Sequence, residues 1–215
     1  MQTSVSVVIS AAGIGSRMGL DLPKSLIQIR GCSLIERQLG LLDKLVELIV
    51  VVGFRAEQVA REVWETRPDA IIVLNHRYQT TGTASSLSLG AKISSERLVG
   101  LDGDVLLSKG SINGFLNSHE NLLGIMPLSS NNPHKVKIEK DFVTEFDTTE
   151  KSDWEWTGPI NISKFECKDI GDRHVYQGLS NLLPMKAMMV DGIELDYPED
   201  VLRCEEWLDG QNGIR

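Results

Sequence analysis

The sequence predicts an α/β fold, with a mostly parallel mixed sheet between two layers of helices (α/β/α). Two observations support this prediction. Short apolar runs, typical of buried strands, recur at 5–11, 48–52, 70–74 and 98–101, and segments with helical signals separate them. Such alternation favours parallel strands with helices on both faces. The second half instead carries alternating runs at 136–140 and 142–146, which are typical of an antiparallel hairpin.

Local signals place the individual elements. Ser33 with Glu36 three positions later forms a capping box, which predicts a helix from there to about Asp43. Pro198 suits the first turn of a last helix, which should reach about Leu208. The other expected elements are strands at 25–29, 48–52, 70–74, 98–101, 122–126, 159–163 and 188–190, helices at 56–65, from 83 and at 175–183, a polar segment at 147–157 and a loop at 192–198.

Length and charge bound the class of protein. The 215 residues, 41% of them hydrophobic, are enough to bury a core, and we expect a single domain over residues 1–215. The net charge of −8 argues against a nucleic-acid partner. It also means that an anionic ligand must be met by local cations rather than by the field of the whole protein.

The cysteines and the apolar runs indicate the setting. Cys32, Cys167 and Cys204 are odd in number, lie far apart and form no C-x-x-C pair, which favours a reduced, cytoplasmic environment. The longest apolar stretch, 45–52, contains Glu47 and is too short to span a bilayer, so we expect no membrane partner. The oligomeric state stays open.

Small residues directly follow the first expected strand, and two cations come after them. Backbone N–H groups at the carboxyl end of a buried strand can approach an anion closely where no Cβ intervenes. Ligands bind at this edge of open α/β sheets. Arg17 and Lys24 add positive charge, which makes the loop suitable for phosphate, including a triphosphate. The small residues are Ala11, Ala12, Gly13, Gly15 and Ser16.

The loop can be compared with three known sequence patterns. A dinucleotide fingerprint needs a third glycine or alanine, where this chain has Met18. A P-loop needs a Gly-Lys pair, which the loop lacks. The pattern A-A-G-x-G-S-R-M, followed by Pro23-Lys24, fits a third signature at each position. An ordinary glycine-rich turn with incidental charges is the plain alternative.

Acidic residues follow two later elements. Asp102 and Asp104 end an expected strand of the same sheet, and paired carboxylates can offer oxygens to magnesium, although Asp-Gly is also a common turn pair. Asp196 precedes the last expected helix, where a helix entry is the plain interpretation. Gly82 and Thr83 begin another helix, whose amino terminus favours polar or anionic groups.

Two tryptophans stand in a charged segment. Trp154 and Trp156 are two positions apart and would face the same side of an extended chain. Aromatic faces beside carboxylates can hold an amine or a quaternary ammonium group, so these residues are weak candidates for substrate binding. Packing of both rings on the sheet is an equally good interpretation. The four histidines show no metal-ligand or triad spacing.

The chain resembles the nucleotidyltransferase superfamily with the nucleotide-diphospho-sugar transferase fold. The segments that carry the resemblance occur in the family's order and are the glycine loop, Gly82, Gly103-Asp104-Val105, 156–160 and 196–200. The resemblance implies a Rossmann-like architecture and transfer of a nucleotide to a phosphorylated alcohol with release of pyrophosphate. Among its branches the chain is most similar to phosphocholine and other phospho-alcohol cytidylyltransferases. Arg17 and Lys24 are seven positions apart, a shorter spacing that resembles the cytidylyltransferases of methylerythritol or ribitol phosphates, so the acceptor stays open.

The resemblance also implies roles for particular residues. Arg17 and Lys24 would be catalytic, with Arg17 on the leaving pyrophosphate and Lys24 between the α-phosphate and the acceptor phosphate. Asp104 and Asp196 would hold magnesium as the cofactor. The nucleotide, which the resemblance favours as CTP, would be bound by Ala11, Ala12, Gly13, Gly15, Ser16, Gly82, Thr83 and Asp102.

The expected function is therefore a magnesium-dependent cytidylyltransferase that acts on a phosphocholine-like, phosphonate or polyol phosphate acceptor. A sugar-1-phosphate nucleotidyltransferase is an alternative. A nucleotide-binding regulatory module without turnover is another, which the joint presence of Arg17, Lys24, Asp104 and Asp196 disfavours. A dinucleotide-dependent oxidoreductase is disfavoured by Met18.

Overall fold

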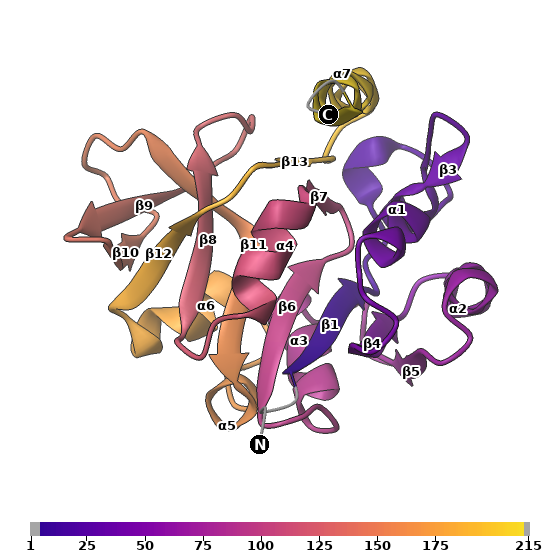
Figure 1. The fold of residues 1–215 in the computed structure, drawn as a ribbon, viewed down its shortest axis with the longest axis horizontal. Helices are drawn as coiled ribbons and strands as arrows, with labels where there is room; N and C mark the ends of the chain where they lie inside the picture. The colour runs from indigo at the N-terminus through magenta and orange to yellow at the C-terminus, as the bar shows by residue number, and fades with distance from the viewer. Residues whose placement is uncertain (1–4, 213–215) are drawn as a thin grey trace.

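A mixed sheet organises the computed structural model, which describes residues 5–212 (Figure 1). Within these residues it has nine strands in the order β5-β4-β1-β6-β11-β8-β12-β10-β9. The strands are β1 (Val5–Ala11), β4 (Glu47–Val52), β5 (Ile71–Leu74), β6 (Arg97–Asp102), β8 (Leu122–Pro127), β9 (His134–Glu139), β10 (Phe142–Phe146), β11 (Trp154–Ser163) and β12 (Met185–Met189).

Parallel pairing is concentrated where the sequence predicts it. β1 lies between β4 and β6 and is parallel to both, and β5 extends the parallel part at the edge. β11 then runs antiparallel to β6 and β8, and β9 and β10 form the expected antiparallel hairpin. The predicted mixed α/β fold is confirmed, with its antiparallel pairings in the second half.

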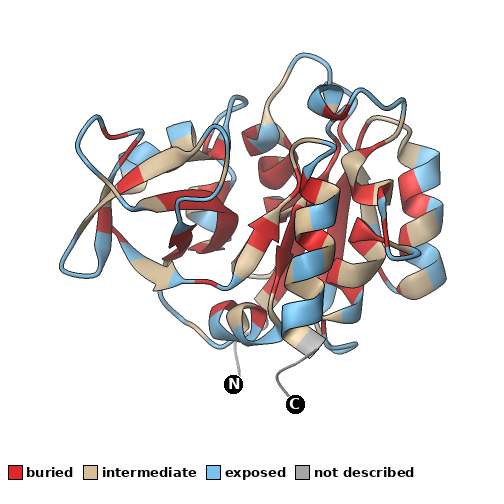
Figure 2. Cartoon of the chain, turned by 90° about the horizontal axis from the view of Figure 1, so that it is seen from above, coloured by how far each residue is buried: buried red, intermediate tan, exposed pale blue. Residues whose placement is uncertain are grey.

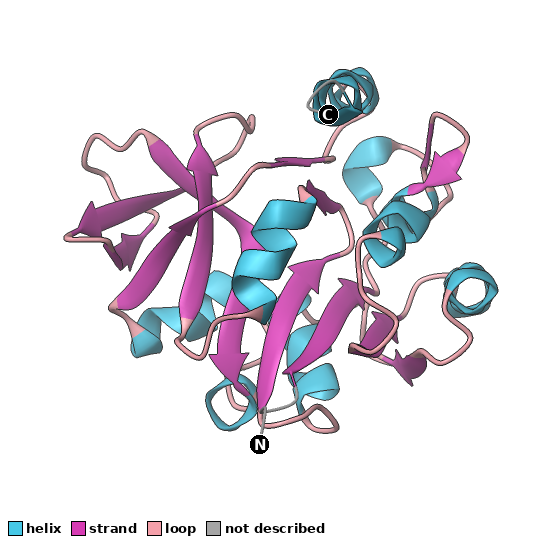
Figure 3. Ribbon diagram, in the orientation of Figure 1, coloured by secondary structure: helices cyan, strands magenta, loops and turns pink. Residues whose placement is uncertain are grey.

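Helices cover both faces of the sheet (Figures 1 and 3). α1 (Leu34–Gly40), α2 (Ala56–Thr66) and α4 (Lys109–Leu116) share one hydrophobic cluster with β1 and β4. α3 (Thr83–Ala91), α5 (Lys164–Cys167) and α6 (Val175–Leu179) share a second. Alternate residues of β4 feed the two clusters, since Val50 belongs to the first and Val51 to the second. Figure 2 shows the buried strands between helices whose outer sides are exposed.

A third, smaller cluster sits at the end of the sheet where β1 and β6 finish. It joins the short strands β7 (Val105–Leu107) and β13 (Gly192–Glu194) to α7 (Asp200–Asn212) and to β2 (Gln28–Ile29), which pairs with β3 (Cys32–Ser33). β13 pairs antiparallel with β7, with Glu194 opposite Val105. Leu195 N also donates to Asp104 O at 2.9 Å. This pairing brings the segment before α7 beside the turn that follows β6.

Several predicted elements differ from the structure. The predicted strand at 25–29 is wrong over its first half, because Lys24–Leu26 forms the 3-10 turn η2, closed by Ile27 N donating to Lys24 O. α4 has no counterpart among the predicted elements, because Gly110 and Gly114 obscure a helix that Ser108 caps and that buries Phe115. The other 3-10 turns are η1 (Ser16–Met18) and η3 (Ser180–Leu182).

Boundaries in the second half also shift. The polar segment expected at 147–157 ends earlier, because β11 already begins at Trp154. The helix predicted at 175–183 is α6 followed by η3, the predicted strand at 188–190 is β12, and the predicted loop at 192–198 contains β13. Within residues 5–212, no helix has the length and apolar character needed to cross a membrane.

Candidate active site

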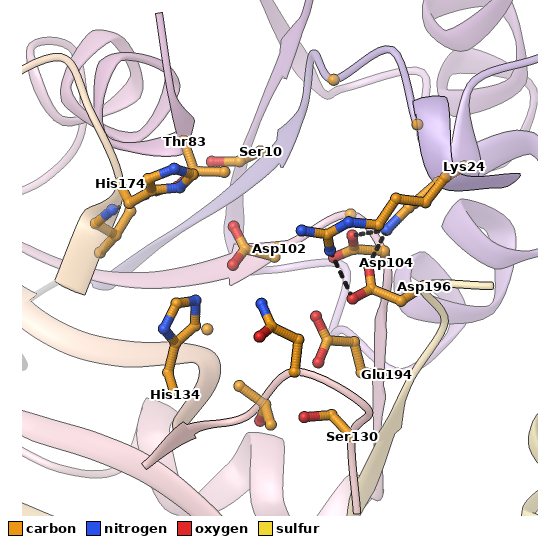
Figure 4. A pocket seen from close by; sticks show the side chains of 18 of the residues that line it. Ser10, Lys24, Thr83, Asp102, Asp104, Ser130, His134, His174, Glu194 and Asp196 are labelled. Atoms are coloured by element: carbon orange, nitrogen blue, oxygen red, sulfur yellow. Dashed lines mark hydrogen bonds and ion pairs between the residues drawn. The ribbon is translucent and has the colours of Figure 1, made fainter. Parts of the chain in front are cut away.

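A cavity of about 350 Å³ opens at the carboxyl ends of β1 and β6 (Figure 4). Segments far apart in the sequence form its wall: the loop after β1, the turn η2, the turn after β6, the middle of β11, the start of α6 and the residues after β13. Most residues predicted from the sequence line it, namely Ala11, Gly13, Gly15, Ser16, Arg17, Lys24, Thr83, Asp102, Asp104, Trp156 and Asp196. Of the described residues that were predicted, Ala12, Gly82 and Trp154 lie outside this lining.

Neighbouring segments fix the loop after β1. Ala12 O accepts a hydrogen bond from Phe54 N at 3.0 Å, which explains why Ala12 lies behind the cavity wall. Gly15 has φ +66°, and Met18 N donates to Gly15 O at 3.0 Å while the Met18 side chain is buried in the third cluster. A Cβ on Gly15 would lie 2.8 Å from Lys24 Cγ. Glycine at this position therefore lets the Lys24 side chain pass against the loop.

Two cations meet two acids at one end of the cavity (Figure 4). Lys24 Nζ donates to Asp104 Oδ2 at 2.9 Å and also to Asp196 Oδ1, and Arg17 Nη1 donates to Asp196 Oδ2 at 2.9 Å. Burial opposes the Lys24 charge, but Asp104 and Asp196 outweigh it and raise the pKa of Lys24 above its ordinary value. Lys24 is therefore a permanent cation held at a fixed point, whereas Arg17, with 51% of its side chain exposed, is open to solvent.

Glu194 is a third acid at this point, and it was not among the residues predicted from the sequence. Single carboxylate oxygens of Asp104, Glu194 and Asp196 all lie within 4.8 Å of one another. Burial, with Asp104 and Asp196 adding to it, raises the pKa of Glu194. Three carboxylates so close together offer the hard oxygen ligands that magnesium takes. The pattern Glu194-Leu195-Asp196 held a usable signal, because a buried Leu195 in an extended segment turns both acids to the opposite side.

Asp102 lies between the two ends of the cavity, and its position depends on two neighbours. Burial, and then Asp104, raises the pKa of Asp102. Gly158 has φ +108°, and a Cβ there would lie 2.4 Å from Asp102 Oδ2, so glycine allows this approach. Gln38 Nε2 donates to Asp102 O at 2.8 Å and to Val105 O at 2.7 Å, which fixes the turn between β6 and β7. Gln38 is a positioning residue that the sequence alone gave no reason to single out.

Asp200 fixes the backbone that carries Asp196. Asp200 Oδ2 accepts from Asp196 N at 2.9 Å and from Tyr197 N at 2.8 Å, while Oδ1 accepts from Arg203 Nη1 at 2.7 Å. Burial opposes the Asp200 charge, but the backbone N–H groups and Arg203 hold the pKa of Asp200 below its ordinary value. The ionised side chain thus ties the start of α7 to the candidate metal ligand.

The Gly82-Thr83 segment contributes to the wall through contacts with residues 172–175. Gly82 N donates to Asp172 O at 2.7 Å, and a Cβ on Gly82 would lie 2.1 Å from Arg173 O, so only glycine fits. Thr83 lines the cavity, and its Oγ1 accepts from Val175 N at 3.3 Å. The predicted loop therefore contacts residues 172–175 directly, and this contact also positions the start of α6.

The two tryptophans pack on the sheet, and only Trp156 reaches the cavity wall among the described residues. Both side chains belong to the second hydrophobic cluster, so they share one face of β11, as their spacing predicts. Trp156 is buried, with the Phe146 ring edge-on at a centroid distance of 5.6 Å. Trp154 contributes to packing outside the lining.

With this geometry established, comparison with known proteins identifies the family. Residues 7–145 match the family model of the MobA-like NTP transferase domain, which covers more than half of the chain. The chain belongs to this family. The matched stretch contains the loop after β1, Lys24 and the acidic turn after β6, so the chain is an enzyme of the nucleotidyltransferase type.

Curated relatives match only part of the chain. The bifunctional protein GlmU of Paracoccus denitrificans is 36% identical over 108 residues, which is 49% of this chain and 23% of the relative. The GlmU protein of Ruegeria sp. is 37% identical over 110 residues, 50% of this chain and 23% of the relative. The chain thus spans about a quarter of the length of these relatives.

Solved structures share the fold along nearly the whole chain. The inositol-1-phosphate CTP transferase of T. maritima aligns with a TM-score of 0.81 at 20% identity, over 99% of this chain and 98% of that one. The CTP:phosphocholine cytidylyltransferase LicC of Streptococcus pneumoniae aligns with a TM-score of 0.78 at 21% identity, over 95% and 99%. A putative glucose-1-phosphate thymidylyltransferase of Bacillus anthracis aligns with a TM-score of 0.76 at 14% identity, over 94% of each chain.

Proposed function

We propose that the chain is a magnesium-dependent cytidylyltransferase, which transfers CMP from CTP to the phosphate of a small phosphorylated alcohol and releases pyrophosphate. The observation that carries the proposal is the meeting of Lys24 with Asp104 and Asp196 beside the loop after β1. The choice of CTP and of a phospho-alcohol is supported by the fold shared with the T. maritima and S. pneumoniae CTP-dependent transferases.

In this reaction an oxygen of the acceptor phosphate attacks the α-phosphorus of CTP in line. The new P–O bond forms as the bond to the bridging oxygen of the β-phosphate breaks, and the electron pair leaves with pyrophosphate. Such transfers depend on positioning and charge stabilisation more than on covalent help from the protein.

The residues of the loop and the cavity end would share this work. Backbone N–H groups of residues 13–16 hold the triphosphate, in a segment with little side-chain bulk, while Ala12 supports the loop from behind the cavity wall. Arg17, which is exposed enough to reach a ligand, stabilises the leaving pyrophosphate. Lys24 stands between the α-phosphate and the acceptor phosphate, where its fixed position keeps the two in line. Thr83, which lines the cavity, faces the nucleoside, while Gly82 fixes the start of α3 from outside the lining. Asp102 lies behind the reacting groups.

Asp104, Glu194 and Asp196 are the residues that would hold magnesium, because their oxygens converge within 4.8 Å. Bound there, the ion would neutralise negative charge on the phosphates. The donor set suits a hard divalent cation, which prefers carboxylate oxygens and keeps sites for substrate phosphates.

A sugar-1-phosphate nucleotidyltransferase is the second candidate. The likeness to the putative glucose-1-phosphate thymidylyltransferase of Bacillus anthracis, over 94% of each chain, favours it. The acids and cations would act identically in that reaction, so the two candidates differ in the acceptor and in the base rather than in the chemistry at phosphorus.

A pyrophosphate-release assay with each common nucleoside triphosphate and a panel of phosphorylated acceptors tests the proposal. We expect turnover with CTP and a phospho-alcohol, only when a divalent cation is present. Asp104→Asn should lose at least about 100-fold in turnover. Asp141→Asn is the matched control, since Asp141 is an exposed turn residue with φ +70°, a conformation that asparagine tolerates.

Each other outcome rejects the proposal in a distinct way. Turnover only with sugar 1-phosphates establishes the second candidate. Binding of CTP without pyrophosphate from any pair indicates a regulatory nucleotide-binding module. Turnover of Asp104→Asn equal to that of Asp141→Asn removes Asp104 from the metal site.

A further inference from the structure

We propose that the end of the cavity opposite the acids recognises hydroxyl groups, so that the acceptor is the phosphate of a polyhydroxylated alcohol and not of a quaternary amine. This inference rests on the proposed function and names its substrate class. It comes from three rings and one buried hydroxyl: His134, His174, Tyr176 and Thr157, all of which line the cavity. Figure 4 shows His134 and His174 on one side of Asp102, with Lys24, Asp104 and Asp196 on the other.

The three rings form one group, in which Tyr176 contacts both imidazoles. The His134 and Tyr176 centroids are 4.3 Å apart with the planes at 35°, and the His174 and Tyr176 centroids are 5.8 Å apart with the planes at 20°. The residues come from the start of β9 and from the start of α6, so two separate elements fix the group. Since the phenol ring packs against both imidazoles, the groups best placed to meet a ligand are the polar ring nitrogens.

Asp147 orients His134. His134 Nδ1 lies 3.0 Å from Asp147 Oδ1, and because a carboxylate accepts, the contact places a proton on Nδ1. Nε2 is then left for a ligand and can accept a hydrogen bond from it whenever the ring is neutral. Asp147 has φ +51°, in the left-handed region that aspartate adopts more readily than most residues. An imidazole fixed in this tautomer can accept a hydrogen bond from an alcohol hydroxyl.

Thr157 supplies a second observation that points to a ligand. Thr157 lines the cavity, and its Oγ1 is buried without a hydrogen-bond partner among the described residues. A buried hydroxyl without a partner is destabilising, so a ligand group that pairs with it gains affinity. Ser25, the neighbour of Lys24 in the sequence, also lines the cavity, and its Oγ is likewise buried without a hydrogen-bond partner among the described residues.

The same contacts disfavour a quaternary amine. A trimethylammonium group neither donates nor accepts hydrogen bonds, and proteins recognise it mainly by open aromatic faces. Trp156 is buried against Phe146. Glu155, the carboxylate between the two tryptophans, is buried and accepts from the backbone and hydroxyl groups of Ser129 and Ser130. Asp147 is occupied by His134. The amine site suggested by Trp154 and Trp156 therefore has little support.

Acceptor preference tests the inference directly. Pyrophosphate release with CTP is compared for ribitol 5-phosphate, a sugar 1-phosphate and phosphocholine, and calorimetry measures the affinity for each acceptor separately. We expect kcat/KM for a hydroxylated acceptor to exceed that for phosphocholine by at least about 100-fold, because a site built to pair hydroxyls rejects analogues that lack them. Equal or better use of phosphocholine overturns the inference. If no acceptor gives pyrophosphate, the proposed function fails, and the calorimetric ranking still decides the hydroxyl preference.

Two variants separate recognition from folding. Thr157→Val should raise KM for the hydroxylated acceptor about 10-fold, leave KM for CTP unchanged and not lower Tm, because valine removes a hydroxyl that the folded chain leaves unpaired. Thr157→Ser restores the hydroxyl and should restore KM. His134→Phe keeps a ring against Tyr176, removes Nε2, and should give the same split between the two KM values. If Thr157→Val lowers Tm, and if neither Thr157→Val nor His134→Phe changes KM for the acceptor, the two residues have a purely structural role and the inference is overturned.

Discussion

Lys24 and Asp196 are 172 positions apart in the sequence, and their side chains form an ion pair at one end of the cavity. Two local structures produce the pair. The turn η2 presents Lys24 just after the glycine loop, and the pairing of β13 with β7 carries Asp196 to the turn after β6. The hydrogen bond from Leu195 N to Asp104 O completes this pairing one residue before Asp196. The small β7–β13 sheet thus brings Asp196 next to Asp104 and within reach of Lys24.

Replacing Lys24 with methionine tests the cation. The variant keeps the length of the stem and loses the charge that pairs with Asp104 and Asp196. We expect turnover to fall by about 100- to 1000-fold, the usual cost of removing one preorganised charge-stabilising group. Pyrophosphate release at saturating CTP measures this loss, and circular dichroism verifies the fold. Lys92→Met, at an exposed helix end, is the control, and near-normal turnover of Lys24→Met would remove Lys24 from the mechanism.

Arg17, Lys24, Asp102 and Asp104 could be singled out from short, contiguous patterns, because the two cations follow a glycine loop and the two acids follow a strand. Asp196 was indicated only by the family resemblance, since its local sequence fits an ordinary helix entry. Glu194 escaped, because its position depends on a pairing of β13 with β7 that no short-range pattern indicates. Gln38 escaped for the same reason, since its two acceptors lie 64 and 67 positions away.

In the fold too, elements with a clear local pattern could be predicted, and elements that depend on long-range pairing could not. The buried parallel strands were predictable because continuous apolar runs have few other uses in a globular chain. The turn at Lys24–Leu26 was mistaken for a strand, because alternation of polar and apolar residues fits a 3-10 turn followed by a short strand equally well. β11 extends through Trp154 because cross-strand pairing with β8 and β9 overrides the polar character of the segment.

Two glycines in the loop after β1 give a matched test of the Lys24 position. Gly15 and Gly19 have φ of +66° and +65°, so alanine costs each the same backbone strain, about 1 kcal/mol. Only at Gly15 would the new Cβ meet Lys24 Cγ, at 2.8 Å, whereas at Gly19 nothing lies within 4 Å. We expect a loss of stability in urea denaturation for both variants, at least as large in Gly15→Ala, and a loss of turnover of about 10-fold or more only in Gly15→Ala. Equal turnover in both variants would show that the contact with Lys24 does not matter.

Asp200 should act through Asp196. Asp200→Ala removes the acceptor of Asp196 N and Tyr197 N, which costs about 1 kcal/mol as the loss of a helix cap does. It also frees the backbone of a candidate ligand, so the magnesium concentration for half-maximal activity should rise about 10-fold, as when a supporting contact of a metal ligand is lost. Asp209→Ala, which removes an exposed acid of the same helix, should leave that concentration unchanged. A purely structural Asp200 would change Tm in the variant and leave the magnesium dependence as in the wild type.

The raised pKa of Glu194 predicts a specific pH dependence of stability in the absence of divalent cations. Because burial and the neighbouring Asp104 and Asp196 raise this pKa, the folded chain keeps a proton that the unfolded chain releases above about pH 4. The folded state then binds more protons, so the free energy of unfolding falls as pH rises from about 4 toward the raised pKa. Glu194→Gln removes the titrating carboxyl group, so the free energy of unfolding of the variant should fall less than that of the wild type between pH 5 and 8.

Urea denaturation in EDTA at several pH values measures the difference. Asp102 has a raised pKa as well and remains in the variant. The free energy of unfolding of Glu194→Gln should therefore still fall with pH, but less steeply than that of the wild type. Glu199→Gln removes an exposed carboxylate from the same segment and should follow the wild type. Magnesium should reverse the trend in the wild type, because a metal ligand must give up its proton and binding therefore strengthens as pH rises. Parallel curves for Glu194→Gln and the wild type, with and without magnesium, would exclude Glu194 from both the buried acid cluster and the candidate metal site.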